Sequence, residues 1–297
     1  MSGNVKWPAL PLAKWRQTCE TLHMWTQVVG KVALAATPLV NHHWNVAFRL
    51  GSRGLATRPM EAGDGRTLTI TFDFVDHRLL IQASDGGTET IQLTPRTVAD
   101  FHAAVMAALE RMGMRVHIWT MPSEVADPIA FEKDTKHRSY DPAWANAFWR
   151  ALVSMRPVFE EFRCRFVGKS SPVHFFWGSF DLALTRFSGR RAASVPEGVI
   201  EQEAYSHEVI SHGFWPGGGA VDDAAFYAYT KPEPDGFRDS IVKPAGARYE
   251  SSFGIFVLPY EDVRTAASPE QALMTFLEST YEAGARLAQW DRESLER

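Results

Sequence analysis

Apolar residues recur every three to four positions in four stretches of the chain, which is the spacing of one buried helix face. The pattern predicts helices over about residues 12–32, 95–112, 142–162 and 269–287. Three of these stretches begin with a capping residue followed by proline, a typical helix start: Thr94-Pro95, Asp141-Pro142 and Ser268-Pro269. The apolar stripes indicate that all four helices pack against a core.

Between the helices, apolar and polar residues alternate with a period of two, which is typical of strands with one buried face. The alternating stretches are residues 69–74, 79–83 and 90–93 in the first half, and residues 173–183, 205–210, 226–230 and 254–258 in the second. Glycine- and proline-rich turns separate them, as in antiparallel sheets. The pattern therefore predicts an α+β fold.

The order of elements is the same in the two halves of the chain. Each half is predicted to hold a helix, an antiparallel sheet of about four strands and a second helix, over residues 1–120 and 141–297. Residues 121–140 are rich in charge and contain Pro122 and Pro128, so they are predicted as a linker. The repeated order is compatible with an internal repeat or with chance, and the two units can also pack as one compact domain.

Composition changes this picture in one respect. The 297 residues are 45% hydrophobic and 22% charged, near the globular average, but 12% are aromatic. So much aromatic surface must pack in a core, line a cavity or form an interface.

A net charge of −4 without a basic stripe argues against a nucleic-acid partner. Two cysteines are too few for a disulfide framework.

Nothing in the sequence predicts a membrane partner. The longest uncharged stretch, residues 32–48, is interrupted by Pro38 and Asn41 and is too polar to span a bilayer. Residues 1–10 lack the basic head and apolar run of a signal peptide. We therefore expect a soluble, cytoplasmic protein.

The segment from Pro172 to Arg190 is the richest in candidate chemistry. A regular strand would carry His174, Phe176 and Arg186 on one face, and Trp177 and Asp181 on the other. An imidazole and a guanidinium among aromatic rings suit a pocket for a small, planar, anionic molecule. The alternative is a buried strand whose His and Asp side chains bond to backbone groups.

Histidines provide a second hypothesis, a metal site. His207 and His212 are five residues apart, so they do not form the HExxH motif. If His42 or its neighbour His43 met His174 and His207 in space, three imidazoles would suit a divalent transition metal. The sequence offers a transition metal as the candidate cofactor.

These considerations give a set of candidate site residues. The candidate catalytic residues are His174, His207 and Asp181; the candidate ligand-binding residues are Arg186, Arg190, Phe176, Trp177 and Trp215; and the candidate metal ligands are His174, His207 and His42. Arg186 is expected to clamp the anion, and the aromatic residues are expected to form the walls. After Trp215, the run Pro216 to Gly219 is predicted as a mobile turn or lid, or alternatively an anion-binding nest.

Several strings resemble those of a bacterial family classed as a domain of unknown function. They are Leu22-His23-Met24-Trp25-Thr26-Gln27, Phe72-Asp73-Phe74-Val75-Asp76-His77-Arg78, residues 172–181 with Arg186-Phe187-Ser188-Gly189-Arg190, and Ala204-Tyr205-Ser206-His207-Glu208-Val209-Ile210 with Gly213-Phe214-Trp215-Pro216-Gly217-Gly218. The resemblance covers essentially the whole chain and implies a single family unit. It implies no activity, cofactor or catalytic residue.

Three hypotheses about function follow from the sequence. The first is an enzyme that acts on a small anionic organic molecule in an aromatic-lined cleft, with His as metal ligand or acid–base group. The second is a non-catalytic module that binds or senses a small molecule in the same cleft. The third is an oligomeric interaction scaffold. A walled pocket serves catalysis and binding equally, so the sequence leaves open whether the protein is an enzyme.

Overall fold

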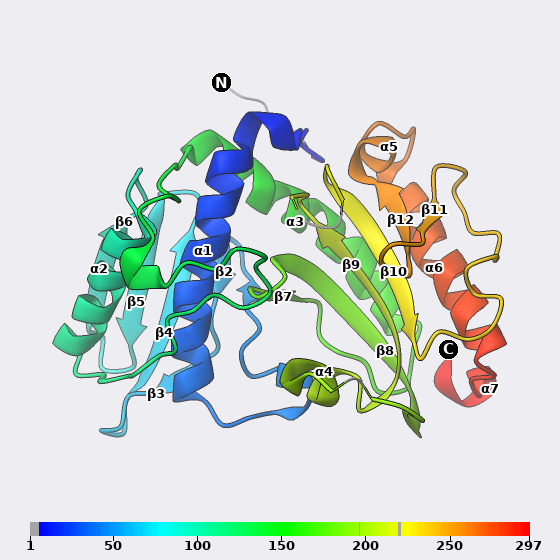
Figure 1. The fold of residues 1–297 in the computed structure, drawn as a ribbon, viewed down its shortest axis with the longest axis horizontal. Coiled ribbons are helices and arrows are strands. Elements are labelled where there is room, and N and C mark those ends of the chain that lie inside the picture. The colour runs from blue at the N-terminus through cyan, green and yellow to red at the C-terminus, as the bar shows by residue number, and fades with distance from the viewer. Residues whose placement is uncertain (1–5, 196, 219–220) are drawn as a thin grey trace.

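The computed structural model describes residues 6–195, 197–218 and 221–297, and it has an α+β fold with two antiparallel sheets of six strands each (Figure 1). The α+β prediction is therefore confirmed. The first sheet contains β1 (Arg49–Leu50), β2 (Gly54–Ala56), β3 (Met60–Glu61), β4 (Thr67–Asp73), β5 (Arg78–Ala83) and β6 (Thr88–Gln92). The second contains β7 (His174–Phe176), β8 (Asp181–Arg191), β9 (His207–Trp215), β10 (Ala225–Lys231), β11 (Arg248–Glu250) and β12 (Ile255–Pro259).

Each sheet has more strands than the four or so expected. The additional strands are only two or three residues long. Such short strands are too brief to show an alternating pattern. The strand order is β1-β2-β4-β5-β6 in the first sheet, with β3 paired to β4, and β11-β12-β10-β9-β8-β7 in the second.

Helices pack against both sheets. They are α1 (Leu12–Ala36), α2 (Val98–Arg111), α3 (Pro142–Cys164), α4 (Val199–Ala204), α5 (Tyr260–Arg264), α6 (Pro269–Leu287) and α7 (Arg292–Leu295), with 3₁₀ turns η1 (Asn41–His43) and η2 (Phe131–Lys133). In Figure 1, α1 lies beside the first sheet and α6 behind the second.

The proline-based helix starts are confirmed at two of three positions. Asp141 accepts hydrogen bonds from the N–H groups of Ala143 and Trp144, and Ser268 caps α6 in the same way. The start predicted at Thr94-Pro95 is wrong by one turn. Helix α2 begins at Val98, because the Thr97 side chain accepts the hydrogen bond of a first-turn N–H group.

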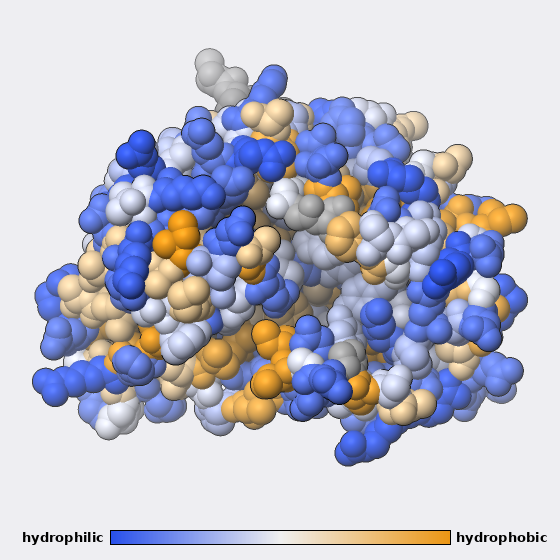
Figure 2. Space-filling view, in the orientation of Figure 1, coloured by the Kyte–Doolittle hydropathy of each residue, from blue (hydrophilic) through white to orange (hydrophobic). Residues whose placement is uncertain are grey.

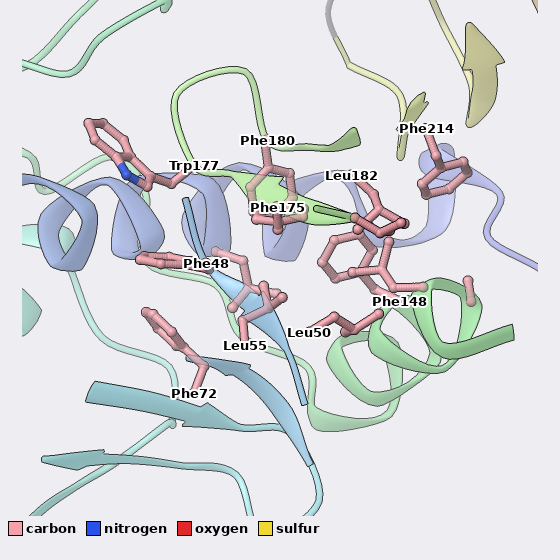
Figure 3. Close-up of a cluster of buried hydrophobic side chains, with 14 of the residues drawn as sticks. Phe48, Leu50, Leu55, Phe72, Phe148, Phe175, Trp177, Phe180, Leu182 and Phe214 are labelled. Atoms are coloured by element: carbon pink, nitrogen blue, oxygen red, sulfur yellow. The ribbon is translucent and has the colours of Figure 1, made fainter. Parts of the chain in front are cut away.

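One pair of backbone hydrogen bonds joins the sheets at their edges. The N–H of Phe48, just before β1, donates to the carbonyl oxygen of Phe175 in β7 at 2.8 Å, and the N–H of Phe175 donates back at 2.8 Å. Figure 3 shows the buried core around this junction, where Phe175 contacts Phe148 and Phe180. The core therefore continues from one sheet to the other.

The strand predicted over residues 173–183 is wrong in a way that matters for the site. Strand β7 ends at Phe176, a turn covers residues 177–180, and β8 returns antiparallel from Asp181. Phe176 pairs with Asp181, so both side chains lie on one face of the sheet. Along β8 that face carries the odd-numbered residues, and Arg186 therefore points to the opposite face.

Candidate functional site

A cavity of about 230 Å³ lies over the concave face of the second sheet. Figure 2 shows this side of the molecule hollowed between α1 and the second sheet. Strands β7 to β10 form the floor, and η1, α4 and the loop at Ser123-Glu124 form the rim. The aromatic side chains that line it are Trp44, Phe176, Trp177, Phe187, Tyr205, Tyr227 and Tyr229.

Asp181 lies at the floor of this cavity and is only 4% exposed. One carboxylate oxygen accepts a hydrogen bond from the Ser179 hydroxyl at 2.5 Å, and the other accepts one from the Tyr227 hydroxyl. Burial raises the pKa of Asp181 to about 6, although both hydrogen bonds favour the ionised form. Within the described residues no Lys, Arg or His forms an ion pair with this carboxylate.

Glu124 supplies a second carboxyl group to the same cavity. The Glu124 side chain is exposed to solvent. Even so, desolvation by the surrounding protein and the charge of Asp181 raise the pKa of Glu124 to about 7. In the part of the chain that the structure describes, its carboxylate makes no hydrogen bond or ion pair. The two acids thus share one small space without a cation.

Helix α1 fixes the loop that carries Glu124. The Gln27 side chain accepts from the Ser123 N–H at 2.8 Å and donates to the Ser123 carbonyl oxygen at 2.7 Å. Lys31 donates to the Ser123 hydroxyl at 3.0 Å. Glu124 itself has a φ of 58°, an uncommon value for a residue other than glycine. Its position is therefore determined by the packing of this loop on α1.

Two glycines provide the space that the acidic groups and their partners occupy. A Cβ on Gly213 would lie 2.3 Å from the Tyr227 ring and hydroxyl, so only glycine lets Tyr227 cross β9 to reach Asp181. A Cβ on Gly178 would lie 2.6 Å from a carboxylate oxygen of Glu124. Glycine inside a strand or turn often marks such a close approach.

Hydroxyl groups extend the polar floor beyond Asp181. The Tyr205 and Tyr229 hydroxyls lie 3.2 Å apart, and the Thr185 and Ser211 hydroxyls lie 2.9 Å apart. Burial raises the pKa of Tyr227 and of Tyr229, so both phenols remain protonated. The floor therefore combines uncharged hydroxyls with Asp181, while Glu124 lies at the rim.

His42 lines the cavity, and both its ring nitrogens are occupied. The Lys169 ammonium can only donate, so its 2.6 Å contact makes His42 Nε2 an acceptor. His42 Nδ1 then donates to the carbonyl oxygen of Glu203 at 3.0 Å. Burial and the Lys169 charge lower the pKa of His42. His42 is therefore a neutral part of the wall, bonded to the segment that carries α4.

The other predicted histidines lie outside the cavity lining. His174 is 4% exposed beneath Trp44 and Phe176, and burial lowers its pKa to about 3. The His207 ring is 6.0 Å from that of His42, and its Nδ1 is 3.1 Å from the Ser206 hydroxyl. No three His, Cys, Asp or Glu side chains form a metal-binding group in the described residues, so the predicted gathering of His42, His174 and His207 is wrong.

The prediction that Arg186 shares a concavity with His174 is also wrong. Arg186 lies on the opposite face of β8, 2% exposed, with its guanidinium over the Phe162 ring and bonded to the Phe162 carbonyl oxygen. Arg190 pairs with Glu208 at 2.7 Å, away from the cavity lining. Neither arginine faces the cavity. The placement of Arg186 follows from the turn before β8, which reverses the predicted faces.

Of the remaining predicted residues, Phe176, Trp177 and Asp181 line the cavity, and Trp215 lines an adjoining one. The sequence did not point to Glu124 or to the three tyrosines. Gly213, inside a strand pattern, was the one available signal for Tyr227. Glu124 gave no signal, because it lies in the segment predicted as a linker.

A family model described as "Family of unknown function (DUF5996)" matches residues 7–297. The chain belongs to this family. The match includes both sheets and every helix from α1 to α7, which confirms the resemblance to a family of unknown function. No curated protein and no solved structure matches the chain. Family membership names no reaction or ligand, so the functional argument rests on the cavity.

Among the helices of the described residues, none is both long enough and apolar enough to cross a membrane.

Proposed function

We propose that the cavity binds a small organic molecule that carries a protonated amine, with Asp181 as its counter-ion. The observation that carries this proposal is a carboxyl group 4% exposed, at the floor of a cavity, without a cationic partner among the described residues. A buried carboxylate is unfavourable unless a cation or several hydrogen bonds compensate it. An ammonium group placed beside Asp181 would supply that compensation.

The walls suit the same kind of ligand. Aromatic faces attract cations, and aromatic cages recognise ammonium groups. Tyr227 and Tyr229 stack with ring centroids 5.9 Å apart, and Trp44 and Trp177 lie elsewhere in the lining. The neutral phenols also provide hydrogen bonds for a polar ligand. A cavity of about 230 Å³ limits the bound portion to a small molecule.

The proposed ligand is cationic, whereas the sequence suggested an anionic ligand. That expectation depended on Arg186, which points to the other face of the sheet. The described cavity lining contains two acids and no Lys or Arg. Lys31 and Lys169 lie near the rim but bond to Ser123 and His42. We therefore propose a cationic group in place of an anionic one.

Acid–base catalysis is a second candidate function, and Glu124 favours it. Its pKa of about 7 is near the value at which a general base is most efficient, and its carboxylate is reachable from the cavity. In this case Glu124 exchanges a proton with the ligand that Asp181 holds. Substrate turnover by the wild-type protein, lost in Glu124→Gln while binding is kept, would distinguish the enzyme from the binding module.

The counter-ion role predicts the effect of Asp181→Asn on amine binding. Calorimetry with hexylamine and benzylamine should show binding to the wild-type protein and at least about tenfold weaker binding to the variant, since hydrogen bonds to charged groups contribute about 1.5–3 kcal/mol. Asn keeps the shape of the side chain and loses its charge. Asp127→Asn, an exposed site outside the cavity, is the matched control. Equal amine affinity in D181N and wild type would contradict the proposal.

The raised carboxyl pKa values predict how amine affinity changes with pH. A cation binds the ionised carboxylate, so affinity should rise as pH rises through about 6 and 7, the pKa values of Asp181 and Glu124. At pH 5 Asp181 is about one-tenth ionised, which weakens binding about tenfold relative to pH 8. Hexylamine stays protonated throughout, and hexanol serves as the neutral control. A flat profile for hexylamine would argue against both carboxylates as the binding groups.

A further inference from the structure

A second cavity of about 200 Å³ adjoins the first. Glu124 and Ser179 line both of them, so these two side chains form the wall between the hollows. The second hollow lies against the first half of α1 and the segment from Trp215 to Gly218. Gly219, the end of the predicted glycine loop, lies outside the described residues.

Arg16 brings a positive charge to this second cavity. It is exposed on α1, and its guanidinium makes no hydrogen bond or ion pair within the residues that the structure describes. Glu20 is one helical turn away, but the two side chains do not form an ion pair. Gly218, with a φ of 92°, comes close enough that a Cβ there would lie 4.0 Å from Arg16. An anion at Arg16 would therefore meet an unpaired guanidinium beside exposed backbone.

Along α1, Arg16 and the shared wall lie at different heights. His23 anchors the shared wall, since its Nε2 bonds to the Gly178 carbonyl oxygen at 2.8 Å and its ring stacks on Phe180 at 5.0 Å. Arg16 precedes His23 by seven residues, which places it about 10 Å further along the helix axis. Arg16 is therefore about two turns of helix from the wall that carries Glu124.

An aromatic surface runs from one cavity to the other. The Trp215 ring, in the second cavity, lies 4.4 Å from the Tyr227 ring, in the first. Tyr227 in turn bonds to Asp181. A ligand that extends from Asp181 towards Arg16 would thus pass Glu124 on one side and these rings on the other.

We infer that the ligand is bipolar, with a protonated amine at Asp181 and a carboxylate at Arg16, joined by an apolar spacer. This inference rests on the proposed amine binding and adds the second charge and the spacer that joins the two charges. Arg16 recognises the carboxylate because a guanidinium matches its two oxygens with paired N–H donors.

The test compares ω-amino acids with alkylamines of the same chain length by calorimetry. The probes are 4-aminobutanoate, 6-aminohexanoate and 8-aminooctanoate, against butylamine, hexylamine and octylamine. We expect one amino acid to bind the wild-type protein at least about tenfold more tightly than its alkylamine, the gain of a charge-assisted hydrogen-bonded pair. Arg16→Gln should remove this gain and leave alkylamine affinity unchanged. Arg115→Gln, an exposed site outside both cavities, should behave as wild type.

The outcomes separate the two proposals. If alkylamines bind and Asp181→Asn weakens them, but no amino acid binds more tightly than its alkylamine, the bipolar ligand is wrong and amine binding stands. A gain that survives in R16Q would also overturn the role of Arg16. If no alkylamine or amino acid binds the wild-type protein, the proposed function fails and the bipolar ligand fails with it.

Discussion

Replacing Gly30 with alanine is expected to lower the free energy of unfolding by about 3 kcal/mol, the upper part of the range for overpacked cores. A Cβ at this position of α1 would lie 2.2 Å from two atoms of the Trp177 ring. The indole is 6% exposed and donates to the Val46 carbonyl oxygen at 3.1 Å, which holds it in place. Alanine favours a helix over glycine by about 1 kcal/mol, too little to offset the overlap.

Urea denaturation of matched variants would measure this effect. Gly51→Ala is the control, because its nearest contact would be 3.6 Å and little change is expected. Trp177→Ala removes the ring that the new methyl group meets. In that background Gly30→Ala should stabilise the helix by up to about 1 kcal/mol, so the double-mutant cycle should show a coupling of about 3 to 4 kcal/mol. An equal loss of stability with and without the Trp177 ring would show that the close packing of α1 on Trp177 is not the cause.

The long elements of the fold were predictable because each has enough residues to show its period. Strand β4 has seven residues with alternating burial, and α6 has a capping serine followed by nineteen helical residues. Strands β1 and β3 have two residues each. Their pairing depends on neighbours that lie elsewhere in the chain, and no local pattern records that dependence.

Apart from His42, the predicted residues that line the cavity lie on one strand end and the turn beside it. Phe176, Trp177 and Asp181 lie within six residues of one another, and all three line the cavity. The tight turn at residues 177–180 changed which side chains share a face, and this turn separated Arg186 from them. A period-two pattern continues through such a turn without a visible break, because aromatic residues occupy the turn as well.

The remaining site residues converge from distant parts of the chain. Glu124 reaches the cavity because Gln27 binds the backbone of its loop, and Tyr227 reaches Asp181 because Gly213 leaves space on the strand between them. The first is a tertiary relation between segments 96 residues apart, and the second is a relation between paired strands. The sequence shows that Gly213 and Glu124 are present, but it does not show which residues they lie beside in the fold.

Acid should destabilise this protein steeply below pH 6.5, because two buried imidazoles and one half-buried imidazole are held in their neutral form. His23 and His174 have pKa values lowered by burial to about 4 and about 3, and the pKa of His212 is lowered well below its ordinary value. In the unfolded chain all three take up protons near pH 6.5, whereas in the fold they do not. Stability present above pH 6.5 is therefore lost as pH falls, by about 1.4 kcal/mol per pH unit for each histidine.

Asp181 opposes this loss of stability, but its contribution is smaller than that of the three imidazoles. Its pKa is raised from 3.8 to about 6, so the folded protein binds its proton first and gains stability between about pH 6 and 4. One carboxyl group offsets one imidazole in this window, which leaves a net loss of about 3 kcal/mol per pH unit. Glu124 acts in the same direction as Asp181, more weakly because water reaches its side chain. Domains are stable by about 5–15 kcal/mol, so a fold at the lower end of this range is expected to unfold near pH 4 to 5.

His174→Phe provides the sharpest test of this balance. Trp44 and Phe176 already surround the site with aromatic rings, and His174 Nε2 is buried without a partner in the described structure, so an apolar ring is accommodated there. The variant should gain stability relative to wild type as pH falls from 7 to 5, by about 2 kcal/mol in urea denaturation. His117→Gln, an exposed histidine, should leave the slope unchanged. Parallel stability curves for H174F and wild type would mean that His174 takes up its proton in the fold as it does in the unfolded chain.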